Sequence, residues 1–168
     1  MSYESPIYKL IEKNSNVEIR SYERFFTSSV REDSLSGNSG FSVLFSYISG
    51  DNKPGRKMAM TIPVINEIDT KKMSMEFVVP RAFYDKGIPE PNQPYVTIKE
   101  YPSALVGVIS FSGVMRGEVI EKQTAKLMER LNSMGYRPTS NIRIARYNSP
   151  FSLPFLRHHE IQVDVTKK

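Results

Sequence analysis

The side chains best suited to metal or acid-base chemistry in this sequence are His158 and His159, the only histidines of the chain. They stand near the start of an alternating stretch that predicts a strand, where successive side chains point to opposite faces. We therefore do not expect the pair to bind one metal ion together. His158 alone is a candidate axial ligand for iron, and the alternative places both rings at the surface or at a strand edge.

Residue patterns typical of nucleophilic catalysis do not occur. The serines form no G-x-S-x-G elbow, and the glycines form neither a G-x-G-x-x-G fingerprint nor a Walker loop. Glu160 would lie on the opposite face of the strand from His159, so the two do not make an acid-base pair. We expect a protein that is not an enzyme.

Four methionines are spaced as if to line one surface. Met58 and Met60 alternate on one expected strand, and Met73 and Met75 alternate on the next. Thioether side chains are flexible and polarisable, which suits an adaptable ligand wall. The alternative is that they fill a core beneath the first helix.

A first helix is expected where Phe41, Leu44, Phe45 and Ile48 recur at helical spacing. These residues share one helix face, which could contact either a ligand or the core. Gly50 follows and is expected to end the helix.

The stretch of residues 145–160 is unusual for a connection between strands. It contains two prolines and several large apolar residues, followed by Arg157. Apolar loops that carry a cation are candidates for closing over a ligand. The alternative is a loop that folds back as a plug.

Bulk composition limits the class of protein. The chain of 168 residues is long enough for one domain, has no Cys, and carries a net charge of +5 from 23 basic and 18 acidic residues. The charges are interspersed without a basic stripe, so nucleic-acid binding is not expected. No apolar run approaches the roughly 20 residues that span a bilayer, and the opening lacks a signal-peptide pattern. We expect a cytoplasmic monomer without membrane insertion.

The elements that must position these side chains occur in a repeated order. Residues 17–30 and 96–109 match with an offset of 79 positions, and a helical stretch and two alternating stretches follow each copy. This pattern predicts one domain, residues 1–168, made of pseudo-repeats 1–80 and 95–168. Residues 81–94 form a Pro-rich linker, which is expected to hold no regular element.

The repeated order predicts an α+β fold. Two βαββ units with antiparallel strands can bury their apolar faces by wrapping both sheets into a distorted antiparallel β-barrel with two helices packed outside. An open α+β sandwich is the alternative. Duplicated halves that face each other usually leave a cleft, and clefts bind small ligands.

Three sequence blocks carry a family resemblance. The opening VEIRSY, the centre FSYISGDNKPGRKMAMTIPV and the ending ARYNSPFSLPFLRHHEIQVDV resemble, in the same order, conserved blocks of the SOUL heme-binding-protein family. The resemblance implies a barrel of duplicated βαββ units, shared with gyrase-inhibitor-like effector-binding domains. It also implies a tetrapyrrole ligand in a shallow apolar site on the first helix and adjacent loops, where Phe41 and Phe45 match the apolar contacts.

The cations of that site do not match. Where heme-binding relatives have basic helix residues that meet propionates, this chain has Asn38 and Ser46. Ser21 stands where some relatives have a histidine. An uncompensated carboxylate at an apolar site is unfavourable. Nearby basic residues that could take over are Arg56, Lys57 and Arg157.

The resulting hypothesis is non-enzymatic binding of heme or a related tetrapyrrole. Propionate contacts are expected from Arg56 or Arg157, and apolar ring contacts from Phe41, Leu44, Phe45, Met58 and Met60. A regulatory module that binds another small molecule, a peptide or a protein partner in the cleft between the repeats is the alternative. An enzyme acting on tetrapyrroles is a third hypothesis.

Overall fold

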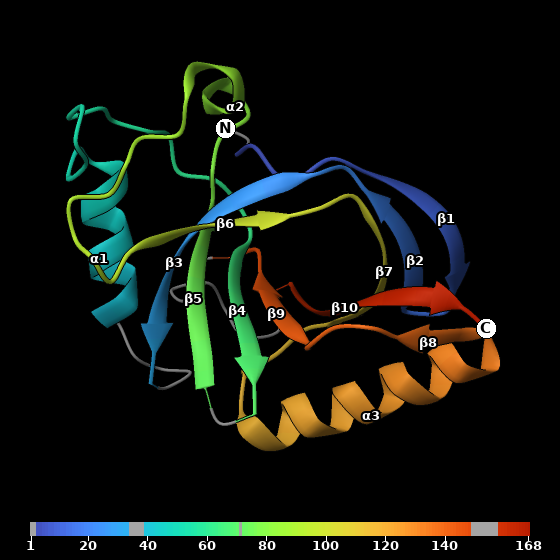
Figure 1. The fold of residues 1–168 in the computed structure, drawn as a ribbon. Coiled ribbons are helices and arrows are strands. Elements are labelled where there is room, and N and C mark those ends of the chain that lie inside the picture. Colours follow the sequence, from blue (N-terminus) through green and yellow to red (C-terminus); the bar gives the residue numbers. More distant parts are fainter. Residues whose placement is uncertain (1–2, 34–38, 71, 149–157) are drawn as a thin grey trace.

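The computed structural model describes residues 3–33, 39–70, 72–148 and 158–168, and within them the chain forms one large sheet and three helices (Figure 1). Each pairing between named strands is antiparallel, so the predicted α+β class is confirmed. The elements in chain order are β1 (Tyr8–Asn14), β2 (Val17–Tyr22), β3 (Phe25–Glu32), α1 (Ser39–Ile48), β4 (Val64–Asp69), β5 (Lys72–Val78), α2 (Ala82–Lys86), β6 (Thr97–Tyr101), β7 (Ala104–Phe111), α3 (Gly117–Ser133), β8 (Tyr136–Pro138), β9 (Arg143–Arg146) and β10 (His159–Lys167).

The sheet is open. Its ten strands follow the order β1-β2-β7-β10-β9-β4-β5-β3-β6, with β8 paired to β10 beside this path. Among the pairings between described residues, none joins the edge strands β1 and β6. The predicted barrel is therefore not closed, because closure requires the first and last strands to exchange hydrogen bonds.

Strand registers follow the 79-residue offset of the sequence. Thr27 of β3 pairs with Lys99 of β6, and Arg20 of β2 pairs with Val106 of β7. Residues 27 and 106 are equivalent under the offset, as are 20 and 99, so the same pairing occurs once in each half. Strand β6 of the second repeat thus pairs with β3 of the first, and β2 of the first repeat pairs with β7 of the second. These registers support the predicted duplication, which stays a prediction.

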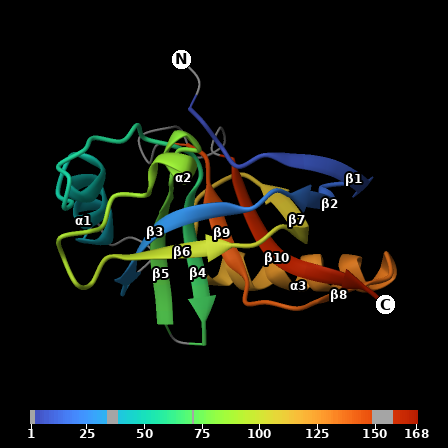
Figure 2. The same cartoon turned by 45° about the horizontal axis from the view of Figure 1, so that its top comes forward.

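The two longer helices lie on one face of the sheet, which we call the outer face. Helix α1 packs on β3 and β5, and α3 packs on β7, β8 and β10, as Figures 1 and 2 show from two directions. Apolar residues such as Phe77 and Ile161 fill the space beneath the helices. The opposite, inner face carries its own apolar cluster, whose buried members are Tyr22, Phe25, Ile65, Val78, Tyr101, Val106 and Val108.

Two elements differ from the sequence expectations. The strand expected to include Met58 and Met60 begins only at Val64, just after the cis peptide bond between Ile62 and Pro63. Pro63 lacks the amide hydrogen that a ladder uses, which explains the late start. The linker does hold a regular element, the five-residue helix α2, so the prediction of two helices was wrong by one. Pro80, just before the linker, and Gly87 flank the helix and do not interrupt it.

Candidate ligand-binding site

The outer flank of α1 exposes two stacked aromatic rings. Phe41 and Phe45 are 39% and 51% exposed, and their ring centroids lie 6.1 Å apart with an angle of 14° between the planes. Residues four apart share one side of a helix, which brings these rings together. The ring of Phe41 also makes an edge-to-face contact with Phe77 of β5, with 5.2 Å between the ring centroids, so the core below holds the pair in place. The two rings together expose apolar surface to solvent.

Leu44 and Met58 lie beneath this surface. Leu44 is fully buried, and Met58 is 7% exposed in the same core cluster. The backbone amide of Met58 donates a hydrogen bond to the carbonyl of Ile48 at 2.7 Å, which ties the loop to the end of α1. Met60 is half-buried against the cluster. Of the five predicted ring contacts, the structure places Phe41 and Phe45 at the surface, Met60 beside the core, and the other two inside it.

Arg56 lies in the loop that follows α1. Its side chain is exposed, and its backbone is fixed by Asn52, a buried amide. The Nδ2 of Asn52 donates to the carbonyls of Tyr47 and Arg56, and its Oδ1 accepts from the Arg56 amide at 2.9 Å. The loop is thus attached to the last turn of the helix. The other predicted cation, Arg157, and the aligned position Asn38 lie outside the described residues.

The inner face holds an ion pair that is almost completely buried. The guanidinium of Arg20 donates two hydrogen bonds to the carboxylate of Glu160, at 2.8 Å and 3.0 Å, and a third to Glu18 at 2.7 Å. Arg20 is 4% exposed and Glu160 is 2% exposed. The ring of Tyr8 covers the guanidinium at 4.3 Å. Bidentate geometry of this kind is the strong form of an ion pair.

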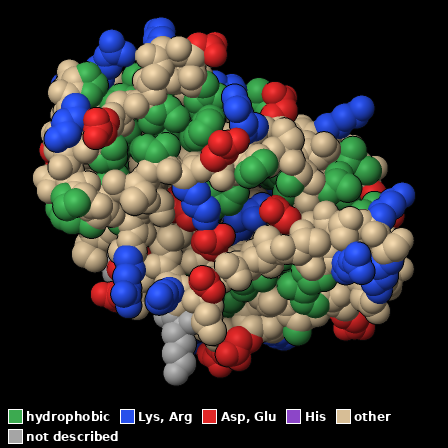
Figure 3. All heavy atoms as spheres, viewed as in Figure 1, with side chains coloured by type: hydrophobic (Ala, Val, Ile, Leu, Met, Phe, Trp, Pro, Cys, Tyr) green, Lys and Arg blue, Asp and Glu red, His purple; other side chains and the backbone are tan. Residues whose placement is uncertain are grey.

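A second charged cluster lies on the inner face of the other half. The carboxylate of Glu76 has no exposed surface and accepts hydrogen bonds from the hydroxyls of Thr27 and Tyr101, both at 2.8 Å. The ammonium of Lys99 lies 3.6 Å from Glu76 and 2.7 Å from Glu67. Figure 3 shows cationic and anionic side chains gathered in a hollow on this side of the molecule.

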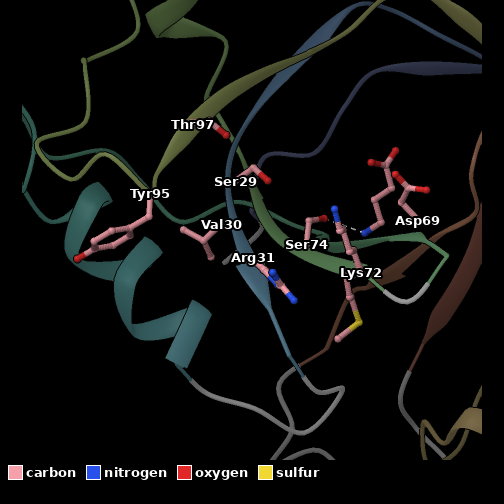
Figure 4. A pocket seen from close by; sticks show the side chains of 10 residues that line it. Ser29, Val30, Arg31, Asp69, Lys72, Ser74, Tyr95 and Thr97 are labelled. Carbon is pink, nitrogen blue, oxygen red and sulfur yellow. Dashed lines mark hydrogen bonds between the residues drawn. The ribbon is translucent and has the colours of Figure 1, made fainter.

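A cavity of about 340 Å³ opens beside the second cluster (Figure 4). In the close-up, Tyr95 lies at the end nearest α1 and Asp69 at the opposite end. The other lining residues are Ser29, Val30, Arg31, Glu67, Lys72, Met73, Ser74 and Thr97.

Comparison with known families identifies the chain. The sequence model of the SOUL heme-binding protein family matches residues 3–164, nearly the whole sequence. The chain belongs to this SOUL family. Comparison with curated proteins gave no match. No helix of the described residues is long and apolar enough to span a membrane.

Solved structures share the fold of this SOUL chain at low identity. The EcmrR C-terminal domain has a TM-score of 0.68 at 14% identity, covering 96% of this chain and 99% of that one. A hydrolase from Listeria innocua has a TM-score of 0.61 at 10% identity, covering 92% and 94%. The structure of SAV2435 bound to tetraphenylphosphonium has a TM-score of 0.50 at 10% identity, covering 89% and 93%. These likenesses show the fold alone.

The two histidines of the SOUL chain point to opposite faces of the sheet: His159 is the first residue of β10, and His158 directly precedes it. The ring of His158 faces inward, where its Nε2 lies 3.1 Å from a carboxylate oxygen of Glu160. His159 is buried on the outer face, and its Nε2 lies 2.9 Å from the carbonyl of Gly113. The structure thus does not bring His158 together with Phe41 and Phe45, which lie on the outer side. The described residues contain no cluster of three or more His, Asp or Glu side chains that could hold a metal.

The inward position of Glu160 predicts an acid-sensitive stability for this SOUL chain. Burial alone would raise the pKa of Glu160, but hydrogen bonds from His158 and Arg20 and the charge of Arg20 outweigh burial and lower it to about 2. Because the ordinary pKa is 4.5, this stabilisation is complete above about pH 4.5 and is lost as the pH falls towards 2. Between pH 6 and pH 3 we expect a loss of about 2 kcal/mol in unfolding free energy from this group. Urea denaturation at the two pH values measures it.

Two matched variants distinguish the contribution of Glu160 to this acid-dependent loss of stability from that of other carboxylates. Glu160→Gln should remove about 2 kcal/mol of the wild-type difference between pH 6 and pH 3. Asp33→Asn, which changes an exposed carboxylate, should keep the wild-type difference. Equal acid losses in wild type and Glu160→Gln would contradict the assignment.

Proposed function

We propose that this protein binds heme or a related tetrapyrrole on the exposed aromatic flank of α1, without catalysing a reaction. The observation that carries the proposal is the stacked, solvent-exposed pair of Phe41 and Phe45. Exposed apolar rings held side by side are typical of binding surfaces. Membership of a heme-binding family supports a planar ligand at this place.

The chemistry of a tetrapyrrole fits this surface. Its flat macrocycle stacks on the rings of Phe41 and Phe45, and aromatic contacts of this kind each contribute about 0.5–1.5 kcal/mol beyond area burial. Its carboxylates require a cation, and Arg56 is the predicted cation next to the C-terminal end of the helix. The site is shallow, since Leu44 and Met58 close it from below.

Replacing Phe45 by Asp tests the site directly. Phe45→Asp removes one ring of the pair and places a carboxylate where the ligand's apolar face lies, so we expect hemin affinity to fall at least tenfold, about 1.4 kcal/mol. The change in the Soret absorbance on titration with hemin measures the affinity. Because Phe45 is half exposed, the fold should tolerate the substitution.

Leu10→Asp is the matched control. Leu10 on β1 is 49% exposed, close to the 51% of Phe45, but it lies on a strand at the other edge of the sheet. It should leave the hemin titration unchanged. If wild type binds hemin no better than Phe45→Asp does, the proposed site is wrong.

Effector binding on the inner face is a second candidate function. The cavity of about 340 Å³ between β3, β4, β5 and β6 favours it. One protein of the same fold was solved with the organic cation tetraphenylphosphonium, and another is the C-terminal domain of EcmrR. A small molecule bound in this cavity would raise the melting temperature without a Soret signal.

Three further expectations belong to the proposal. Two solved structures of this fold are described as hydrolases, so analysis of pigment products after incubation with heme tests our view that the protein is not an enzyme. A monomeric state is checked by sedimentation. A cytoplasmic location, and the absence of nucleic-acid binding, remain predictions from composition.

A further inference from the structure

Lys99 contacts two carboxylates and an aromatic ring on the inner face. Its ammonium lies 2.7 Å from an oxygen of Glu67, 3.6 Å from an oxygen of Glu76, and 4.7 Å from the ring centre of Tyr101. Carboxylates and the face of an aromatic ring are the partners that proteins use to bind organic cations. Lys99 is therefore bound as a free alkylammonium ion would be.

The surroundings of the ammonium are built and rigid. Glu76 is fully buried and is held by the hydroxyls of Thr27 and Tyr101. The ring of Tyr101 stacks on Phe25 with centroids 4.7 Å apart and an angle of 10°. The carboxylate of Glu76 and the ring of Tyr101 would therefore keep their positions if the lysine side chain were absent.

Lys99 differs from Arg20, its equivalent in the other half. Arg20 is 4% exposed and holds Glu160 through two hydrogen bonds, so it is part of the core. The side chain of Lys99 is 32% exposed, and Glu67, its nearest partner, lines the cavity of about 340 Å³. Its ammonium thus lies next to a carboxylate that lines an open cavity.

We infer that Lys99 is a built-in occupant of a cation-binding site formed by Glu67, Glu76 and Tyr101, and that it makes the inner cavity reject cationic ligands. With Lys99 in place the two carboxylates are already neutralised in part, and a second cation would meet the ammonium at short range. The nearby Arg143 is paired with Asp164 at 2.9 Å, and its guanidinium also lies 5.1 Å from the ring centre of Tyr101. Removing the lysine charge leaves the carboxylate of Glu67, which lines the cavity, and the buried carboxylate of Glu76 beside the ring of Tyr101 without this ammonium.

The charge of Lys99 determines which class of ligand the cavity accepts. In the wild-type protein it takes neutral or anionic molecules, for which Arg31 and Lys72 line the wall. A positively charged effector is excluded. This inference rests on the inner-face contacts and is independent of tetrapyrrole binding at α1.

Chemical rescue tests the occupied site. Lys99→Ala removes the side chain, and n-butylammonium supplies the missing alkylammonium group. At about ten times its dissociation constant, n-butylammonium should raise the melting temperature of Lys99→Ala by about 3–6 °C. Neither the neutral isostere n-butanol nor NaCl at the same concentration should raise the melting temperature of Lys99→Ala. Lys72→Ala changes another cation of the same cavity, and n-butylammonium should not raise its melting temperature.

Binding of a large cation tests the exclusion. Tetraphenylphosphonium, followed by calorimetry, should bind Lys99→Ala and Lys99→Met at least about tenfold more tightly than wild type or Lys99→Arg. Adding Glu67→Gln to Lys99→Met should reverse most of the gain. The inference fails if wild type and Lys99→Arg bind the cation as well as Lys99→Met does, or if n-butylammonium gives no rescue. A hemin titration that is unchanged by Lys99→Met separates either failure from the tetrapyrrole proposal.

Discussion

Arg20→Met is expected to lower the free energy of unfolding by about 3–5 kcal/mol at pH 7, because it leaves the buried carboxylate of Glu160 without its guanidinium. Methionine keeps most of the volume, so the effect is due mainly to charge. For a domain of this size the loss corresponds to a fall of about 10 °C in melting temperature. Urea denaturation followed by circular dichroism measures the change.

The double variant Arg20→Met/Glu160→Gln serves as the control for Arg20→Met. Removing both charges leaves no unpaired ion in the interior, so part of the stability should return. Lys13→Met changes a cation that is 59% exposed near Glu18, and it should shift stability by less than about 0.5 kcal/mol. A loss below about 1 kcal/mol for Arg20→Met would show that solvent reaches the ion pair.

The class of the fold could be predicted because its elements carry strong local periodicity. The helical spacing of Phe41, Leu44 and Ile48 predicted the first helix, and Gly50, with a φ of 124°, follows the end of α1 as expected. The 79-residue offset anticipated equivalent strand registers. These features depend on residues near one another in sequence, where periodicity is informative.

Sheet closure and the charged inner face could not be predicted in the same way. Whether β1 meets β6 depends on the curvature of the whole sheet, which no short segment determines. Arg20 and Glu160 are 140 positions apart, and each one alone resembles a solvated strand residue. One signal was available: Arg20 aligned with Lys99 across the repeat, and a cation at equivalent strand positions of both halves indicates a shared environment.

The candidate site was predicted in part. Family resemblance selected Phe41 and Phe45, and the structure places both at the surface. The period-two spacing of the methionines selected Met58, whose burial depends on how the loop after α1 folds back under the helix. Sequence spacing treated Met58 as a strand residue because alternation alone does not distinguish a strand from an extended loop. The inward pairing of His158 with Glu160 follows from their spacing of two, which places both side chains on one face of a strand.

The inner face also explains why a planar ligand is proposed for the outer one. Duplicated halves were expected to leave an apolar cleft between them. Buried charges and stacked rings, including Arg20, Glu160, Glu76 and Tyr101, fill much of that region. A flat apolar guest would separate these charges from their partners, at a large free-energy cost. On α1 it displaces only water from Phe41 and Phe45.

Leu131→Ala is expected to give the other large loss of stability, about 2–5 kcal/mol, by opening a cavity under α3. Leu131 is fully buried against β7 and β10, at a position where Gly107 leaves room for it. A Cβ added at Gly107 would lie 2.7 Å from one methyl carbon of Leu131, so Gly107→Ala is expected to destabilise the wild-type chain by about 1–3 kcal/mol through overpacking.

In the Leu131→Ala background the same glycine substitution should have little effect or restore some stability, because its methyl group then enters the cavity. The two substitutions should thus be strongly non-additive in a double-mutant cycle measured by urea denaturation. Additive losses would mean that α3 does not pack on β7 through this contact. Because α1 and its rings lie on the other half of the sheet, hemin binding by the folded fraction should be the same in all four proteins of the cycle, which separates stability of the second half from recognition by the first.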